Sequence, residues 1–165
     1  MVKRIAILSC SVLLALLALG CNRDEDPNHF ANEAAQGGLA EVQMGRLAAE
    51  RATNPAVKQF GQQMVDDHSK AGNELMQLAA RKHMQLPTDV SAEQKETMTK
   101  LSKLSGADFD KAYVDAMVDD HEHDVKDFQA QANEGKDADL KAFAAKTLPV
   151  IQHHLQMIKD IKAKM

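Results

Sequence analysis

The strongest constraint on the fold is a helical repeat of apolar residues that runs through most of the chain. Apolar side chains recur at alternating steps of three and four residues over four long stretches, at about 29–52, 55–83, 108–133 and 137–162. Side chains at this spacing share one face of an α-helix, so each stretch predicts an amphipathic helix. Such helices bury their apolar stripes against one another, which predicts an all-α four-helix bundle.

The composition agrees with this fold class and argues against one kind of partner. Aromatic residues make up 4% of the 165 residues, and Trp is absent. The net charge is −4, with both signs mixed along the chain. No basic stripe and no run of aromatic residues is present, so binding to nucleic acid is not expected.

The breaks between the stretches suggest how the helices connect. Asn54 before Pro55 is typical of an N-cap followed by a first helical turn, so the first two helices should be antiparallel neighbours. The connection at 85–105, between the second and third long helices, is the longest. Within it, Ser91 and Gln94 predict a capping box that opens a short helix. This connection suits either direction of the third long helix, and the sequence leaves that choice open.

Each long stretch carries one ionisable residue near the middle of its apolar stripe. The sequence Met-Val-Asp-Asp-His occurs twice and places His68 and His121 there, while Glu41 and His154 take the equivalent place in the other two helices. The mid-points of bundle helices meet in one layer, so these four side chains should converge. Each would be costly to bury alone.

Two interpretations of this layer remain open. A carboxylate and three imidazoles suit a single divalent transition-metal ion, such as zinc, copper, iron or manganese. A metal-free network of hydrogen bonds would also satisfy the four groups if every member had a partner. Asp67 and Asp120, beside two of the histidines, either orient imidazole rings or lie exposed. Met64 and Met117, one turn earlier, are either copper(I) ligands or ordinary core residues.

The N-terminus predicts export. Lys3 and Arg4 precede an apolar run at 5–19, which is short for a membrane span and typical of a signal peptide. The run leads to Gly20-Cys21, which is similar to the cleavage site of bacterial lipoproteins. We therefore expect a signal peptide of the lipoprotein type at 1–20, a lipid on Cys21, a tether at 21–28 and a helical domain at 29–163. A plain secretory signal and an uncleaved anchor are the alternatives.

The two cysteines agree with this prediction. Cys10 lies in the signal segment and Cys21 carries the lipid, so the domain itself has no thiol for a disulfide or for nucleophilic catalysis. The lipid would make the membrane the partner of this protein.

Asn22 follows Cys21 in place of the Asp that often signals retention in the inner membrane. The expected location is therefore the periplasm, anchored to the outer membrane rather than the inner one.

Several motifs resemble those of the family called domain of unknown function 4142. They are Gly38-Leu39-Ala40-Glu41-Val42 with Gly45, Met64-Val65-Asp66-Asp67-His68, Phe109-Asp110-Lys111-Ala112-Tyr113, His121, and Leu148-Pro149 followed by His154. They occur in the family's order and cover most of the chain after residue 28. The resemblance implies an exported bacterial protein with a ferritin-like four-helix fold, in a family often labelled as outer membrane proteins, and it leaves the function unassigned.

The sequence departs from ferritin-like enzymes at the positions that would hold a pair of irons. Those enzymes carry Glu-x-x-His on two helices, whereas Val65, Val118 and Ile151 stand three residues before the histidines here. We therefore favour a non-enzymatic, lipid-anchored protein that binds one metal ion and serves in metal handling or envelope stress. The alternatives are an oxidoreductase that detoxifies metal or peroxide, and a metal-free structural or partner-binding module.

Overall fold

The structure, a computed structural model, describes residues 27–165. The predicted signal peptide, the lipidation site at Cys21 and most of the tether lie outside these residues. The described part contains five helices and no strand: α1 (Pro27–Arg51), α2 (Pro55–Arg81), α3 (Ala92–Ser102), α4 (Gly106–Glu134) and α5 (Ala138–Lys162). The all-α prediction is therefore confirmed: α1, α2, α4 and α5 are the four long helices, and α3 is the short one.

The predicted helix caps are present. The side chain of Asn54 accepts a hydrogen bond from the backbone N–H of Ala56 at the start of α2. Ser91 and Gln94 form the capping box of α3. The side chain of Asp137 accepts hydrogen bonds from two backbone N–H groups of α5. These local bonds satisfy donors that the first turn of a helix leaves free, which explains why the sequence placed these starts correctly.

Other helix ends differ from the prediction by one or two residues. Helix α1 begins at Pro27, two residues before the expected start and inside the predicted tether. Helix α2 ends at Arg81 because Lys82 forms its C-cap and His83 adopts a left-handed backbone with φ 54°. Helix α4 begins at Gly106, whose φ of 60° is also left-handed and suits glycine.

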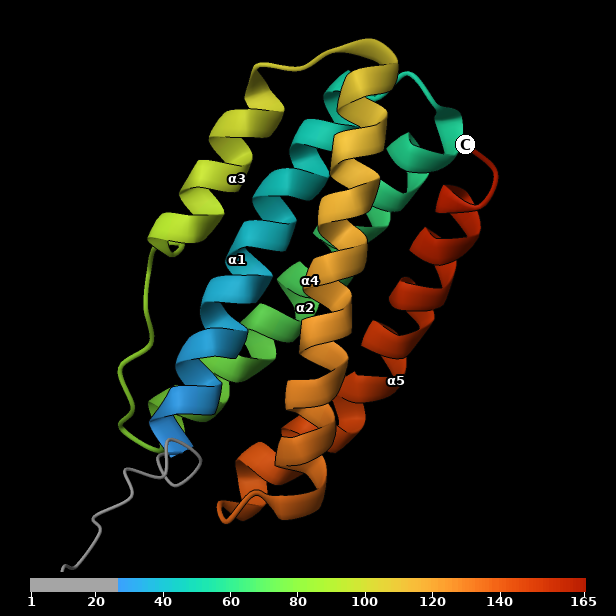
Figure 1. The fold of residues 1–165 in the computed structure, drawn as a ribbon. Coiled ribbons are helices and arrows are strands. Elements are labelled where there is room, and N and C mark those ends of the chain that lie inside the picture. Colours follow the sequence, from blue (N-terminus) through green and yellow to red (C-terminus); the bar gives the residue numbers. More distant parts are fainter. Residues whose placement is uncertain (1–26) are drawn as a thin grey trace, which may run out of the picture.

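The helices form two antiparallel hairpins packed against each other. Helix α1 packs along α2 and α4 along α5, and α1 also contacts α4 while α2 contacts α5. Following the colours in Figure 1, α2 and α4 both run downward, and the connection that links them, with α3, runs upward along the left side of the bundle. Helices α2 and α4 are thus parallel, which answers the question that the sequence left open and agrees with a ferritin-like bundle.

The apolar core is divided into two clusters. One contains Phe60, Met64, Phe109, Met117 and Ile158. The other contains Leu75, Phe128, Leu140, Phe143 and Ile151. On α2, α4 and α5, the central histidine falls between residues of the two clusters. The polar layer predicted from the sequence therefore separates two apolar halves of the bundle. Met64 and Met117 pack in the core, which is the role expected of ordinary core methionines.

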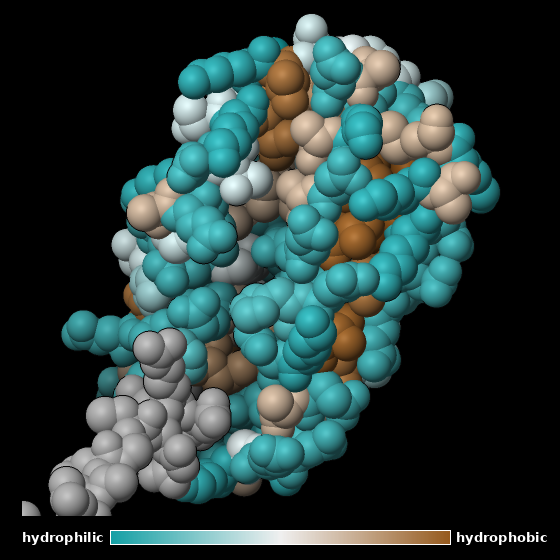
Figure 2. All heavy atoms as spheres, in the orientation of Figure 1, coloured by the Kyte–Doolittle hydropathy of each residue, from teal (hydrophilic) through white to brown (hydrophobic). Residues whose placement is uncertain are grey.

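Much of the face seen in Figure 2 is hydrophilic, and hydrophobic atoms reach the surface there in short patches between hydrophilic side chains. This is the pattern expected of amphipathic helices that turn one stripe inward. Within residues 27–165, every helix is too short or too polar to cross a membrane.

Two glycines fix the closest approach between α1 and α2. A Cβ added to Gly61 would lie 2.7 Å from the backbone oxygen of Gly45, and one added to Gly45 would lie 2.7 Å from the oxygen of Gly61. Both distances are too short for real carbon atoms, so the helices can cross here only without side chains. Gly45 thus serves the close packing of the two helices, while Gly38 has no such neighbour.

We predict that Gly61→Ala lowers the free energy of unfolding by about 2 kcal/mol, because the two helix backbones must move apart. Gly72→Ala is the matched control on the same helix, since nothing lies within 4 Å of its added Cβ. This control should raise the free energy of unfolding by about 0.5–1 kcal/mol through its better helix propensity. Urea unfolding of both variants measures the difference. Equal effects would show that the crossing is not tightly packed.

Candidate metal centre

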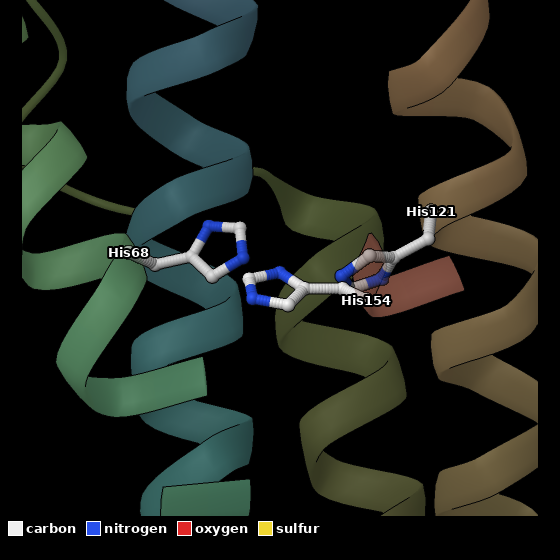
Figure 3. A group of neighbouring side chains, drawn as sticks. All are labelled: His68, His121 and His154. Carbon is white, nitrogen blue, oxygen red and sulfur yellow. The ribbon is translucent and has the colours of Figure 1, made fainter. Parts of the chain in front are cut away.

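The layer between the two core clusters brings together three histidines from three helices. His68 comes from α2, His121 from α4 and His154 from α5, and their rings point toward one another (Figure 3). Ligand atoms from the three rings lie within 4.8 Å of one another. His121 and His154 are fully buried, and His68 is 8% exposed. The predicted convergence of the histidines is therefore present in the structure.

One nitrogen of each ring is held by a neighbouring oxygen. His121 Nδ1 donates to the backbone oxygen of Met117 at 3.0 Å. His154 Nε2 lies 2.9 Å from Oδ2 of Asp67, and His68 Nδ1 lies 2.6 Å from Oε2 of Glu41. Carboxylate and carbonyl partners of this kind fix the orientation of a metal-binding imidazole and the position of its proton.

The other nitrogen of each ring has no hydrogen-bond partner among the described residues. These atoms are His68 Nε2, His121 Nε2 and His154 Nδ1. A backbone oxygen only accepts, so the proton of neutral His121 lies on Nδ1 and its Nε2 presents a lone pair. The same reasoning leaves a lone pair on Nδ1 of His154, because Asp67 accepts from Nε2. His121 and His154 thus each present an unpaired nitrogen acceptor to the layer.

The three imidazoles are neutral near pH 7. Burial, together with repulsion from the two neighbouring imidazoles, lowers the pKa of His121 to about 3. Burial likewise lowers the pKa of His68 to about 4 and that of His154 to about 4. A metal ion binds the neutral form of histidine, so the rings are already in the protonation state that coordination needs.

Glu41 lies in the layer, as the sequence predicted, and its carboxyl oxygens lie beside His68 and His121. It is 1% exposed, and burial, followed by repulsion from Asp120, raises its pKa well above the usual range. It therefore shares a proton with His68 through the 2.6 Å contact. Its second oxygen, Oε1, lies 3.4 Å from His121 Nε2 and has no hydrogen bond. Glu41 thus both orients His68 and offers a free oxygen.

The two aspartates beside the histidines play different parts. Asp67 orients a ring, as one interpretation of the sequence expected, but the ring is that of His154 rather than of its neighbour His68. Partial burial favours a higher pKa for Asp67, yet hydrogen bonds from His154 and Gln63 lower it, so this carboxylate stays ionised. Asp120 is half-buried, and one of its oxygens is buried without a partner. Burial raises the pKa of Asp120 to about 6.

Two further polar groups beside the layer were not predicted from the sequence. The hydroxyl of Tyr113 is buried and has no partner among residues 27–165. Burial raises the pKa of Asp124 well above its usual value, and Glu41 and Asp120 add to the rise. Asp124 stands one helical turn after Asp120 on α4, and this spacing was the available signal. A small cavity of about 30 Å³, lined by Glu41, Asp124 and two of the histidines, lies at the side of the layer.

The opposite pKa shifts of His121 and Glu41 predict opposite effects of acid. The pKa of buried His121 lies below its unfolded value of 6.5, so its contribution to stability is present above pH 6.5 and is lost as the pH falls. From pH 7 to pH 5, His121→Leu should therefore lose about 2 kcal/mol less stability than the parent.

The raised pKa of Glu41 works in the other direction. Its contribution is present below the unfolded value of 4.5 and is lost as the pH rises through the folded value. Glu41→Gln should therefore lose more stability than the parent over the same acid step. Urea unfolding at pH 7 and pH 5, without metal, measures both variants. Parallel behaviour of the two would contradict the assigned protonation states.

The fold and this layer define a class of protein, namely a four-helix bundle with a buried cluster of histidines and carboxylates at its middle. The family model for Domain of unknown function (DUF4142) matches residues 21–161, and the chain belongs to this family. This confirms the family suggested by the sequence motifs. No curated protein sequence matches the chain.

Three solved structures are similar in fold. The first, a DUF305 protein from Streptomyces coelicolor described as secreted, shares 14% identity, with a TM-score of 0.69 over 82% of this chain and 90% of that one. The second, a DUF305 fragment from Deinococcus radiodurans, shares 11% identity, with a TM-score of 0.73 over 86% and 99%. The third, described as CopM in the Cu(II)-bound form, shares 11% identity, with a TM-score of 0.70 over 83% and 95%. At these identities the similarity establishes the fold alone.

Proposed function

We propose that this protein binds one divalent transition-metal ion through His68, His121 and His154. Two observations together carry the proposal: one ligand atom from each of the three rings lies within 4.8 Å of the others, and each ring has one nitrogen without a hydrogen-bond partner among residues 27–165. Imidazole is a good ligand for zinc, copper, iron and nickel. A bound cation would give each of these three nitrogens a partner.

The surrounding groups favour a metal over a self-contained polar network. A buried network is stable when every member has a partner, and here several buried polar atoms have none in the described part of the chain. Each ring is instead oriented through its other nitrogen, by Glu41, by the Met117 carbonyl or by Asp67. This arrangement is typical of metal-binding histidines.

Coordination requires only a small closure of the layer. With Zn–N bonds of about 2.0–2.1 Å, nitrogens in a tetrahedral site lie roughly 3.4 Å apart. The three donor atoms are within 4.8 Å of one another, so each ring needs to move inward by about 1 Å or less. When the ion binds, Glu41 and His68 would lose the proton that they share. The Glu41 carboxylate would then accept a hydrogen bond from His68 Nδ1, and His68 Nε2 would bind the ion.

The proposed role is metal handling in the cell envelope, including under stress. A fold neighbour is described as CopM in a Cu(II)-bound form, and another is described as secreted. The apolar run at 5–19 and the lipoprotein-like Cys21 support export and attachment to a membrane through a lipid. A lipid-anchored domain would hold the ion-binding layer close to the membrane surface.

Calorimetric titration of the full-length chain in detergent with zinc chloride tests the binding. We expect one ion per chain with a dissociation constant of about 1 μM or less. His154→Phe should lose this binding. His153→Phe is the matched control, because His153 is exposed and adjacent in sequence. No uptake of zinc, copper, iron or manganese by the parent, or an equal loss in both variants, would refute the proposal.

A further inference from the structure

A second set of ligand atoms overlaps the histidine layer. Glu41, Asp120 and His121 each offer a ligand atom, and these atoms also lie within 4.8 Å of one another. The atoms without a hydrogen-bond partner in the described chain include Glu41 Oε1, Asp120 Oδ2 and His121 Nε2. His121 therefore belongs both to this set and to the set of three histidines.

The two sets differ in the chemistry that they offer. The histidines supply three nitrogens, whereas the second set supplies one nitrogen and two carboxylate oxygens. Zinc and copper bind imidazole well, while manganese(II) favours carboxylate oxygen and water. Because Nε2 of His121 can bind only one ion at a time, two ions cannot both use it.

We propose that the centre has two overlapping positions for one ion, a nitrogen-rich position for zinc or copper and an oxygen-rich position for manganese(II). The inference rests on the proposed metal binding and adds that Glu41 and Asp120 determine which ion is held and where. Glu41 then has a different function for each metal. It orients His68 when zinc is bound, and it coordinates directly when manganese is bound.

Two observations besides the carboxylates support the oxygen-rich position. Nε2 of His121 is a buried lone pair 3.4 Å from Oε1 of Glu41, and neither atom has a hydrogen bond within residues 27–165. The Tyr113 hydroxyl is also buried without a partner, and the charges of Glu41 and Asp120 both act on it. Among the described residues, no lysine or arginine forms a salt bridge with Glu41 or Asp120. In the described part of the chain, the basic side chains that contact Glu41 are therefore those of His68 and His121.

Manganese(II) chloride and zinc chloride are the probes that test this inference. Free manganese(II) gives a six-line electron paramagnetic resonance spectrum that is lost on binding, so the signal reports the free ion. Removing a group that only orients a ligand costs roughly 10–100-fold in affinity, so losing a ligand should cost at least as much. We expect Asp120→Asn to weaken manganese binding by about 10-fold or more, and zinc binding by less than about 3-fold.

Matched variants separate the two positions. Asp119→Asn, which changes the exposed neighbour of Asp120, should leave both affinities unchanged. His154→Phe should remove zinc binding and retain manganese binding. In the parent, zinc added to the manganese-loaded chain should restore the six-line signal, because both ions need His121.

The possible failures are distinguishable. If zinc binds but manganese does not, or if Asp120→Asn weakens both ions equally, the two-position inference is wrong and the proposed zinc site stands. Simultaneous binding of both ions, with no return of the six-line signal, would also overturn it. If neither zinc nor manganese binds, and copper and iron are not taken up either, the proposed function itself fails.

Discussion

Replacing His121 with leucine is expected to abolish tight metal binding while leaving the metal-free chain as stable as the parent, or more stable by about 1 kcal/mol. His121 is fully buried, and its Nε2 has no hydrogen-bond partner among the described residues. A buried polar atom without a partner costs roughly 1–3 kcal/mol, and leucine removes that cost. Loss of the bond from Nδ1 to the Met117 carbonyl offsets part of the gain.

This combination separates a binding site from a structural network. If the three histidines stabilised the bundle by bonding to one another, His121→Leu would lower the free energy of unfolding. Urea unfolding in the presence of a chelator and zinc titration of the same preparation give the two readings. Leu75→Ala, an ordinary truncation in the core, should lose about 2–5 kcal/mol and shows that the assay detects such losses. A loss of that size in His121→Leu, or unchanged zinc affinity, would contradict the account.

Asp110→Ala is expected to lower the free energy of unfolding by about 3 kcal/mol and the melting temperature by roughly 8–10 °C. Asp110 is 2% exposed, and its carboxylate accepts hydrogen bonds from the N–H and hydroxyl of Thr53 and from the N–H of Asn54. These donors lie in the turn between α1 and α2. The Asp110 carboxylate on α4 therefore holds that turn, by hydrogen bonds, against the hairpin formed by α4 and α5.

Two variants of the neighbouring positions test this explanation. Asp110→Asn keeps one acceptor oxygen and should lose about half as much stability as the alanine variant. Asp108→Ala changes an exposed residue in the first turn of α4 and should lose less than about 1 kcal/mol. Thermal and urea unfolding measure all three. An Asp110→Ala chain as stable as Asp108→Ala would show that the contact to the turn contributes little.

The sequence predicted the features that depend on local chemistry. Four apolar stripes predicted the four long helices. Asn54, Ser91 and Asp137 marked the starts of α2, of the short helix α3 and of α5, because caps act within a few residues. The convergence of His68, His121 and His154 was also predictable, because mid-points of bundle helices must meet.

The features that depend on tertiary geometry were not predictable. Asp67 orients His154, which lies 87 residues away, rather than His68 beside it. That pairing depends on how α2 is rotated against α5, and one sequence contains no signal for this rotation. The role of Asp110 was missed for the same reason, since its partners lie 56 and 57 residues away. Which nitrogen of each ring stays free also follows only from these contacts.

X-ray absorption at the zinc edge, on the full-length chain loaded with one equivalent of zinc, tests the central claim most directly. The account predicts a first shell that contains three imidazole nitrogens at about 2.0–2.1 Å. Multiple scattering from the imidazole rings should be present and should decrease in the His154→Phe variant. A first shell made of oxygen alone, or an imidazole contribution unaffected by that substitution, would contradict a metal centre built from His68, His121 and His154.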